Sequence, residues 1–262
     1  MKYMGSKNRI AKHILPIILK DKRIDQYYVE PFVGGCNLID KLGGRRIGSD
    51  NNKYLIAMLK EFQTAANIMG FCQSREHYNS VREAYNVKNS SKYPDWYIGL
   101  IGYMCSANGR FFEGGYSGIS KTKNGAERNY IDESIRNLEK QLPRLLAVDF
   151  HNCNYFDLRI PEDSIIYCDP PYQGTKQYST SREFDYPLFW NWCRKMANSG
   201  HTVFVSEYSA PDDFECVWEM ELKSSLSANK VQGGSKKSVE RLFRASKEKG
   251  NAEIDKARDL MK

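Results

Sequence analysis

The chain has 262 residues, 41% of them hydrophobic, so it can bury a large core, either as one α/β domain or as a core with a sizeable insertion. No apolar run approaches the ~18 residues of a membrane span, and the start of the chain has no signal-peptide core, so we expect a cytoplasmic protein. The seven cysteines form no C-x-x-C pair and show no Cys/His spacing typical of zinc, so we expect no metal site. Its 39 Lys and Arg exceed its 32 Asp and Glu, and the net charge of +7 is compatible with a polyanionic partner without identifying one.

The chain opens on a short motif, Tyr3 to Lys7, that leads into a helical pattern. Isoleucines recur at helical spacing through residues 8–20, which predicts an amphipathic helix. Gly5 and Ser6 allow the backbone to bend where the helix begins, and backbone N–H groups at such a position can meet an anionic ligand. An ordinary helix with Ser6 as its N-cap explains the same residues, so both interpretations stay open.

A glycine turn between two short strands follows. The predicted elements are a strand and glycine turn over 27–36, a helix over 37–42, a strand over 45–50 and a helix over 53–62. This order is typical of nucleotide-binding folds, in which an acid after the second strand, here Asp50, bonds ribose hydroxyls. Asp50 follows Gly34 and Gly35 by 16 and 15 positions, and the turn lacks the G-x-G-x-x-G pattern, so the motif is of moderate specificity.

Residues 60–146 do not alternate strands with helices. We expect helices near 76–85, 96–104 and 132–146, with a stretch rich in glycine and aromatic residues over 106–118. That stretch fits two interpretations. It is either a solvated loop with a few anchoring rings, or a surface that follows a phosphate backbone and reads base edges.

Strand patterns return in the last part of the chain. The expected elements are strands over 148–152 and 164–169, a helix with Leu188, Phe189, Trp192 and Met196 on one face, a strand over 201–207, and strands over 216–222 and 240–245 that pair antiparallel at an edge. The polar segment 227–237 between the last two strands fits either a DNA-contacting hairpin loop or a solvated loop. The charged tail from about Ser246 has no clear core face.

The stretch from Ile165 to Tyr172 carries the most specific chemistry. Its apolar run ends in Asp169, Pro170 and Pro171, and neither proline can donate a ladder hydrogen bond, so a strand has to end there. Asp169 is therefore expected at the carboxyl end of a strand, where open α/β sheets bind ligands. Carboxylate and carbonyl acceptors suit the two N–H groups of an exocyclic amine, and Tyr172 could stack on its ring. A strand followed by a plain Pro-Pro turn also explains these residues.

Four pieces together resemble a known enzyme family: Tyr3 to Lys7, Glu30 to Gly35, Asp50, and Asp169 to Tyr172. They are similar to the Dam-type (D12 class, alpha-group) DNA adenine-N6 methyltransferases of bacteria and phages, over nearly the whole chain. The resemblance implies a doubly wound, mostly parallel sheet of the Rossmann-like AdoMet-dependent methyltransferase fold, with an antiparallel edge strand and a mainly helical insert. It also implies a catalytic domain over 1–59 and 147–262, interrupted by a target-recognition domain over 60–146.

The resemblance assigns roles position by position. The catalytic residues would be Asp169, Pro170, Pro171 and Tyr172. The residues in contact with S-adenosylmethionine would be Tyr3, Lys7, Glu30, Pro31, Phe32, Gly34, Gly35, Asp50, Asn51 and Asp169. The residues in contact with DNA do not come from this match. The composition of the insert and of the later polar loops makes these the candidates: Asn108, Arg110, Tyr116, Lys121, Lys176, Asn229, Lys236 and Lys237. One position departs from the family's F-x-G-x-G pattern, because Cys36 replaces the last glycine and its Cβ could shift the turn.

The implied activity is transfer of the methyl group of S-adenosylmethionine to N6 of a flipped-out adenine in double-stranded DNA. The resemblance implies no metal, a monomer or weak dimer, and a place in the cytoplasm of a bacterium or phage-infected host. Two alternatives remain: an N-methyltransferase acting on RNA or on a protein amide, and a catalytically inactive DNA-binding relative. The insert before the catalytic motif argues against the first, and intact Asp169 and Tyr172 argue against the second.

Overall fold

The computed structural model describes residues 1–262 except 65–73, 88–91, 122–123, 175–183, 224–236 and 247–262. Contacts between residues divide the chain into two compact units. The first unit contains residues 1–15 and 30–159, and the second contains residues 16–29 and 160–262.

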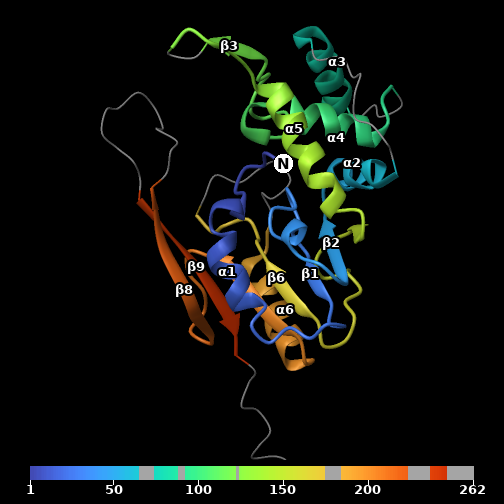
Figure 1. Cartoon of the computed structure of the whole chain (residues 1–262). Helices are drawn as coiled ribbons and strands as arrows, with labels where there is room; N and C mark the ends of the chain where they lie inside the picture. Colours follow the sequence, from blue (N-terminus) through green and yellow to red (C-terminus); the bar gives the residue numbers. More distant parts are fainter. Residues whose placement is uncertain (65–73, 88–91, 122–123, 175–183, 224–236, 247–262) are drawn as a thin grey trace, which may run out of the picture. The chain divides into compact units, whose positions relative to one another are not determined.

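The first unit combines a parallel strand pair with a group of helices (Figure 1). Its elements are η1 (Lys7–Arg9), the start of α1 (Ala11–Ile18), η2 (Ile39–Lys41), β2 (Arg46–Asp50), α2 (Lys53–Thr64), α3 (Arg75–Asn86), α4 (Asp95–Met104), η3 (Ala107–Gly109), β3 (Ile119–Lys121), β4 (Glu127–Asn129), α5 (Tyr130–Gln141), η4 (Leu142–Arg144) and β5 (Val148–Asn152). Strands β2 and β5 are parallel, with Asp50 opposite Asn152, and α2 packs on both strands. Asp50 therefore stands at the carboxyl end of its strand, as predicted.

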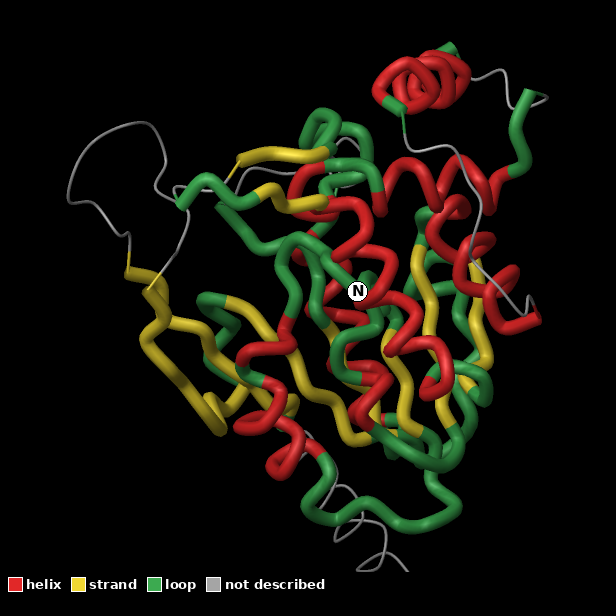
Figure 2. Tube along the Cα trace, turned by 45° about the horizontal axis from the view of Figure 1, so that its top comes forward, coloured by secondary structure: helices red, strands yellow, loops and turns green. Residues whose placement is uncertain are grey.

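Helices α3, α4 and α5 of this unit, drawn as red tubes in Figure 2, enclose a small core of their own. It is built from Tyr78, Val81, Ile98, Ile101, Cys105, Phe112 and Ile131. Helix α4 also packs on α2, and the approach is close because a Cβ on Gly99 would lie 2.1 Å from the Tyr54 carbonyl oxygen. The insert is therefore mainly helical, with one short antiparallel pair, β3 and β4, that the sequence pattern did not predict.

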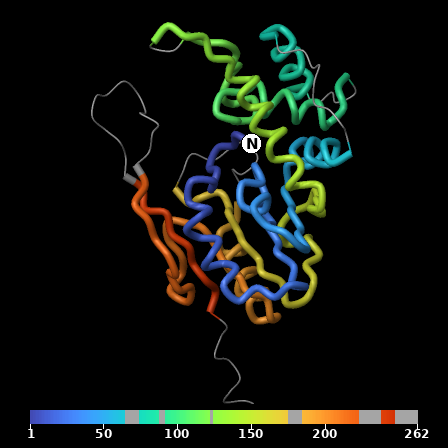
Figure 3. Tube along the Cα trace, in the orientation of Figure 1, coloured from blue at the N-terminus to red at the C-terminus, as the bar shows by residue number. Residues whose placement is uncertain are grey.

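The second unit contains the remaining strands, and those after residue 160 are coloured from yellow to red in Figure 3. Its elements are most of β1 (Tyr28–Glu30), β6 (Ile165–Cys168), α6 (Tyr186–Asn198), β7 (Thr202–Glu207), β8 (Phe214–Lys223) and β9 (Lys237–Ala245). Strand β6 is parallel to β1 and to β7, whereas β9 is antiparallel to both β7 and β8. Strand β1 belongs to both units, and the strand order of the mixed, mostly parallel sheet is β5-β2-β1-β6-β7-β9-β8. The predicted Rossmann-like fold with an antiparallel edge is confirmed.

Two predicted helices differ from the structure. The helix expected over 37–42 is only the 3-10 turn η2, since the chain before it turns at Cys36 with φ +57° and Gly43 and Gly44 follow it. The helix expected over 132–146 ends as an α-helix at Gln141, and Pro143 lies in the 3-10 turn that follows.

The other differences are smaller. Phe189 and Trp192 are buried on α6 as expected. Leu188 is 49% exposed; it lies in the first turn of the helix, directly after Pro187. The predicted loop over 227–237 lies almost wholly, and the tail from 247 wholly, outside the described residues. Among the described residues, no helix is long and apolar enough to cross a membrane.

Candidate active site

The glycine turn after β1 is packed directly against Tyr3. The turn passes through Gly34 at φ +45° and Cys36 at φ +57°. A Cβ on Gly34 would lie 2.8 Å from Cε1 of Tyr3, and a Cβ on Gly35 would lie 2.5 Å from Cβ of Tyr3. Both distances are shorter than any real contact, so this turn needs glycine at both positions. The structure thus brings together three residues predicted to contact one ligand.

Asp50 joins the same turn through its carboxylate. Oδ2 accepts a hydrogen bond of 3.2 Å from the Gly34 amide, and Oδ1 accepts one of 2.9 Å from the Asn52 amide. Burial raises the pKa of Asp50 to about 6, although both amide hydrogen bonds act in the opposite direction. The acid at the end of β2 is therefore fixed to the glycine turn, and its protonation changes close to neutral pH.

Asn52, which sequence reasoning missed, connects α2 to the N-terminal motif. Its Oδ1 accepts from the amides of Tyr54 and Leu55 at the start of α2, and its Nδ2 donates to the Tyr103 hydroxyl over 2.9 Å. The Tyr103 ring stacks on the Tyr3 ring at a centroid distance of 5.7 Å. Helix α4 therefore supports the Tyr3 ring through Tyr103. An Asn at the N-cap position of a predicted helix was the signal that could have pointed to Asn52.

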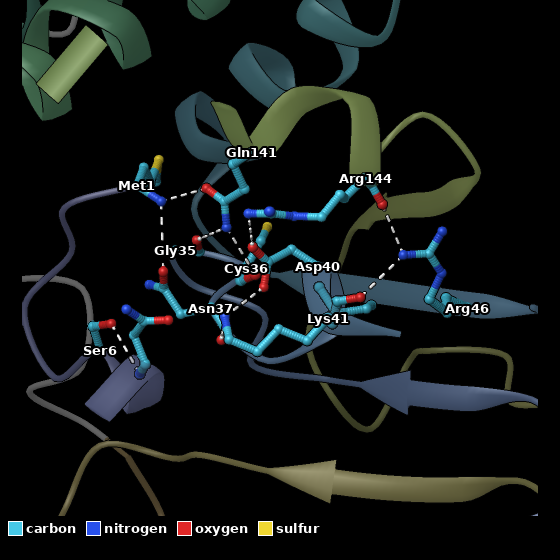
Figure 4. A network of polar contacts seen from close by, with 12 residues as sticks. Met1, Ser6, Gly35, Cys36, Asn37, Asp40, Lys41, Arg46, Gln141 and Arg144 are labelled. Atoms are coloured by element: carbon cyan, nitrogen blue, oxygen red, sulfur yellow. Dashed lines mark hydrogen bonds and ion pairs between the residues drawn. The ribbon is translucent and has the colours of Figure 1, made fainter. Parts of the chain in front are cut away.

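Gln141 holds the other side of the glycine turn (Figure 4). Its Nε2 donates to the carbonyl oxygens of Gly35, over 3.1 Å, and Cys36, over 2.9 Å. Its Oε1 accepts from the Met1 amino group, which also lies 3.5 Å from Oδ1 of Asn37. Nδ2 of Asn37 is buried and has no hydrogen-bond partner in the part of the chain that the structure describes. This donor, 2.6 Å from where a Gly35 Cβ would lie, is available to an acceptor brought by a ligand.

The remaining predicted cofactor residues lie in the same unit, except Asp169, which belongs to the second unit. Lys7 is 8% exposed, and its Nζ donates to the Gly5 carbonyl oxygen over 3.3 Å. Glu30 is buried at the end of β1 and is followed by buried Pro31. The Phe32 ring packs on Tyr155 at 5.3 Å, and Asn51 is exposed.

The predicted catalytic tetrapeptide lies in the second unit, directly after buried strand β6. Asp169 is half-buried there, and Pro170 is buried. The Tyr172 hydroxyl donates a 2.8 Å hydrogen bond to Oε2 of Glu240. Burial, with Asp169 and Glu240 nearby, raises the pKa of Tyr172 well above its ordinary value. Tyr172 is therefore a neutral hydrogen-bond donor at physiological pH.

Two residues that the sequence analysis did not single out complete this group. The Glu207 carboxylate accepts from the backbone amides of Gln173, over 2.5 Å, and of Tyr208. The Tyr208 ring meets the Tyr172 ring edge-on at 4.8 Å. Glu207 ends a predicted strand just as Asp50 and Asp169 do, and that repeated position was the only signal for it.

The predicted DNA-contacting residues are spread more widely. Asn108 is exposed with φ +58°, and Lys121 is exposed on β3. Arg110 is half-buried, and its buried Nε has no partner among the described residues. Tyr116 packs on Tyr78 at 5.5 Å and lies under the Arg75 guanidinium at 4.9 Å. Lys237 begins β9, whereas Lys176, Asn229 and Lys236 lie outside the described residues.

Within the residues that the structure describes, no group of three or more His, Cys, Asp or Glu side chains could hold a metal ion.

The chain was compared with protein-family models, curated sequences and solved structures. A family model described as D12 class N6 adenine-specific DNA methyltransferase matches residues 3–191. No curated protein sequence matches the chain. Among solved structures, the chain is similar to SMU.472, described as a candidate methyltransferase crystallised with SAH, at 11% identity and a TM-score of 0.36. That match covers 92% of this chain and 52% of the other, so the chain spans about half the length of that relative.

Proposed function

Because the chain belongs to the D12 class of N6 adenine-specific DNA methyltransferases, we propose that it transfers the methyl group of S-adenosylmethionine to N6 of an adenine in double-stranded DNA. The family match covers residues 3–191, which include every residue of the cofactor and catalytic groups predicted from the sequence. The reaction would be specific for a DNA site and would need no metal ion.

The residues around the glycine turn fit S-adenosylmethionine. The Asp50 carboxylate at a strand end suits ribose hydroxyls, and the Tyr3 ring suits a flat or sulfonium-bearing ligand. The unpartnered Nδ2 of Asn37 offers a donor for the ligand's carboxylate or another acceptor. When bound, S-adenosylmethionine supplies an electrophilic methyl group on a positively charged sulfur.

The tetrapeptide fits the amine that accepts this methyl group. The Asp169 carboxylate and the Pro170 carbonyl oxygen are acceptors, and Pro170 and Pro171 bring no competing N–H group. Two acceptors that hold both hydrogens of adenine N6 would favour a tetrahedral nitrogen with its lone pair exposed. The catalytic effect would come from orientation and electrostatic support, without a covalent enzyme intermediate.

Access to N6 in a duplex requires the adenine to leave the base stack. Flipping costs a few kcal/mol of unpairing and unstacking. Stacking of the flipped base on Tyr172 would return roughly 1–3 kcal/mol. We assign this role to Tyr172 because it closes the tetrapeptide that Asp169 opens, and because Glu240 and Tyr208 hold its ring.

Recognition of the DNA site is assigned to the insert over 60–146, together with the segment before β9. The insert has its own core and presents exposed Asn108 and Lys121. Arg110 adds a guanidinium with an unpartnered Nε, which suits a phosphate or a guanine edge. The catalytic domain would then comprise 1–59 and 147–262. The enzyme would act as a monomer or weak dimer in the cytoplasm of a bacterium or phage-infected host.

The observation that carries the proposal is the position of Asp169 to Tyr172 directly after buried strand β6 in a chain of this family. The test is transfer of labelled methyl groups from S-adenosylmethionine to duplex DNA, RNA and protein side by side. We expect label in DNA alone, as N6-methyladenine, and loss of at least a hundredfold in rate for Asp169→Ala, which should still bind cofactor and DNA. Label in RNA or protein instead, or full activity of Asp169→Ala, would refute the proposal.

A further inference from the structure

We propose that Glu207 and Glu240 are positioning residues that fix the Tyr172 ring in the plane on which the target base stacks. The inference rests on the proposed function and extends it to two side chains that come from strands β7 and β9. Neither glutamate belongs to the D–P–P–Y tetrapeptide, and they lie 35 and 68 positions after Tyr172. Both contact the tetrapeptide or the residue that follows it.

Glu207 fixes the backbone on the far side of Tyr172. One carboxylate oxygen accepts from the Gln173 amide over 2.5 Å, and the other accepts from the Tyr208 amide. The side chain is 1% exposed, so water does not compete for either bond. Among side chains of this length, only a carboxylate offers two acceptor oxygens and no donor. Glu207 therefore ties the residue after Tyr172 to the end of β7.

Glu240 fixes the other end of the ring. Its Oε2 accepts from the Tyr172 hydroxyl over 2.8 Å, and the Tyr208 ring meets the Tyr172 ring at an interplanar angle of 87°. Tyr208 is itself held, because the Arg241 guanidinium donates to its carbonyl oxygen over 2.5 Å. The hydroxyl and one neighbouring ring thus restrict rotation of Tyr172 about both of its side-chain torsions. A ring restrained in this way loses less entropy when a base stacks on it.

The two glutamates should respond differently to the same isosteric change. Glu240→Gln keeps one oxygen that can accept from the Tyr172 hydroxyl, so most of the positioning should remain. Glu207→Gln replaces one acceptor by an NH2 group, which would face a backbone N–H and push it away. We therefore expect Glu207→Gln to impair the enzyme and Glu240→Gln to be mild.

The experiment compares Glu207→Gln, Glu240→Gln, Glu240→Ala, Tyr172→Phe and the double variant Tyr172→Phe/Glu240→Ala in the full chain. Exposed Glu215 on β8 gives the matched control, Glu215→Gln. Measured for each are kcat and KM with unmethylated duplex DNA, cofactor affinity, thermal midpoint, and emission of 2-aminopurine placed at the mapped target adenine. Stacking quenches that emission, so it reports the ring's hold on the flipped base independently of turnover.

We expect kcat to fall roughly tenfold for Glu240→Ala and Glu207→Gln, and less than threefold for Glu240→Gln, with cofactor affinity unchanged. The double variant should be no slower than Tyr172→Phe, because both changes remove the same hydrogen bond. The impaired variants should show brighter 2-aminopurine.

Three results would overturn the inference: wild-type kcat and emission in Glu240→Ala, equal effects of the two Glu→Gln changes, or multiplicative losses in the double variant. The inference would also be overturned if kcat fell only in variants whose thermal midpoint is lower and the 2-aminopurine emission stayed unchanged. The glutamates would then have a purely structural role. If wild-type enzyme places no methyl group on DNA adenine, the proposed function itself fails, which is a separate outcome.

Discussion

A methyl group added to the glycine turn should damage the proposed cofactor site in a measurable way. In Gly35→Ala the new Cβ would lie 2.5 Å from Cβ of Tyr3 and 2.6 Å from Nδ2 of Asn37, whereas ordinary contacts begin at 3.4 Å. Because Cβ of Tyr3 is bonded to the main chain, a side-chain rotation alone cannot relieve the contact with Tyr3. Either Tyr3 or the turn has to move.

The size of the expected destabilisation follows from the cost of placing an extra methyl group in a closely packed site. Extra carbon atoms in a closely packed site cost about 1–3 kcal/mol, which corresponds to a fall in the thermal midpoint of roughly 3–10 °C for a protein of this size. A loss of about 1 kcal/mol in cofactor binding would be roughly fivefold in Kd. Calorimetric titration with S-adenosylhomocysteine measures the second effect, and scanning calorimetry measures the first.

Gly43→Ala is the matched control. A Cβ on Gly43 would meet nothing within 4 Å, and Gly43, like Gly35, does not have a positive φ. We expect Gly43→Ala to leave both Kd and stability within about 0.5 kcal/mol of wild type. Equal behaviour of the two variants would show that Tyr3 does not pack on the turn as described.

Four further outcomes are expected. Because the pKa of Asp50 is about 6, the affinity of the wild type for the cofactor should weaken about tenfold from pH 7 to pH 5. Asp50→Asn should remove this dependence of affinity on pH. An equal dependence in both proteins would exclude Asp50 as its source. The raised pKa also means that the folded state binds the proton of the Asp50 carboxyl more tightly than the unfolded state does. The contribution of Asp50 to the free energy of unfolding should therefore fall as pH rises from 3.8 to about 6, which urea titrations of the wild type and Asp50→Asn can measure. Tyr103→Phe keeps the ring but removes the acceptor for Asn52 Nδ2, so urea unfolding should show a loss of about 1 kcal/mol, whereas no loss would mean that this hydrogen bond contributes nothing. Charge reversal of Lys236 and Lys237 should weaken DNA binding for all sequences and flatten its salt dependence, and an unchanged salt slope would argue against phosphate contacts.

Much of the fold could be predicted because local patterns and tertiary packing agree. Short strand patterns followed by an acid marked β2 and β6; in the structure Asp50 ends β2 and Asp169 directly follows β6. The helix expected over 37–42 failed because its pattern is only six residues long and has glycines on both sides. At that length, the positive φ of Cys36 decides the conformation.

The sequence indicated residues that the structure brings together around the glycine turn, but it did not indicate the residues that support them, and the role of the group in cofactor binding stays a prediction. Tyr3, Gly34 and Asp50 belong to a recognisable motif, so the sequence indicated them. Gln141 and Tyr103 hold the same group from about 100 positions away, and their partners are backbone carbonyls and a ring face. No sequence spacing records such a contact, since it depends on how the insert folds.

The same limit applies to the recognition and catalytic surfaces. Tyr116 was predicted to contact DNA only from the composition of the stretch over 106–118. In the structure its ring packs on Tyr78, so its role in DNA binding stays a prediction. Glu240 lies in an alternating strand pattern that is explained by sheet formation. Its hydrogen bond to Tyr172 arises only from the antiparallel register of β9 with β7.

The central claim is that this chain methylates adenine N6 in DNA, and Asp169 is the residue on which the chemistry depends. The most direct measurement is expression of wild type and Asp169→Ala in a host that lacks DNA methylation, followed by base-resolution mapping of N6-methyladenine in its DNA. We predict methylated adenines confined to one short sequence context with the wild type, and none with Asp169→Ala. DNA without N6-methyladenine in the wild-type culture, with the protein present and able to bind S-adenosylhomocysteine, would contradict the claim.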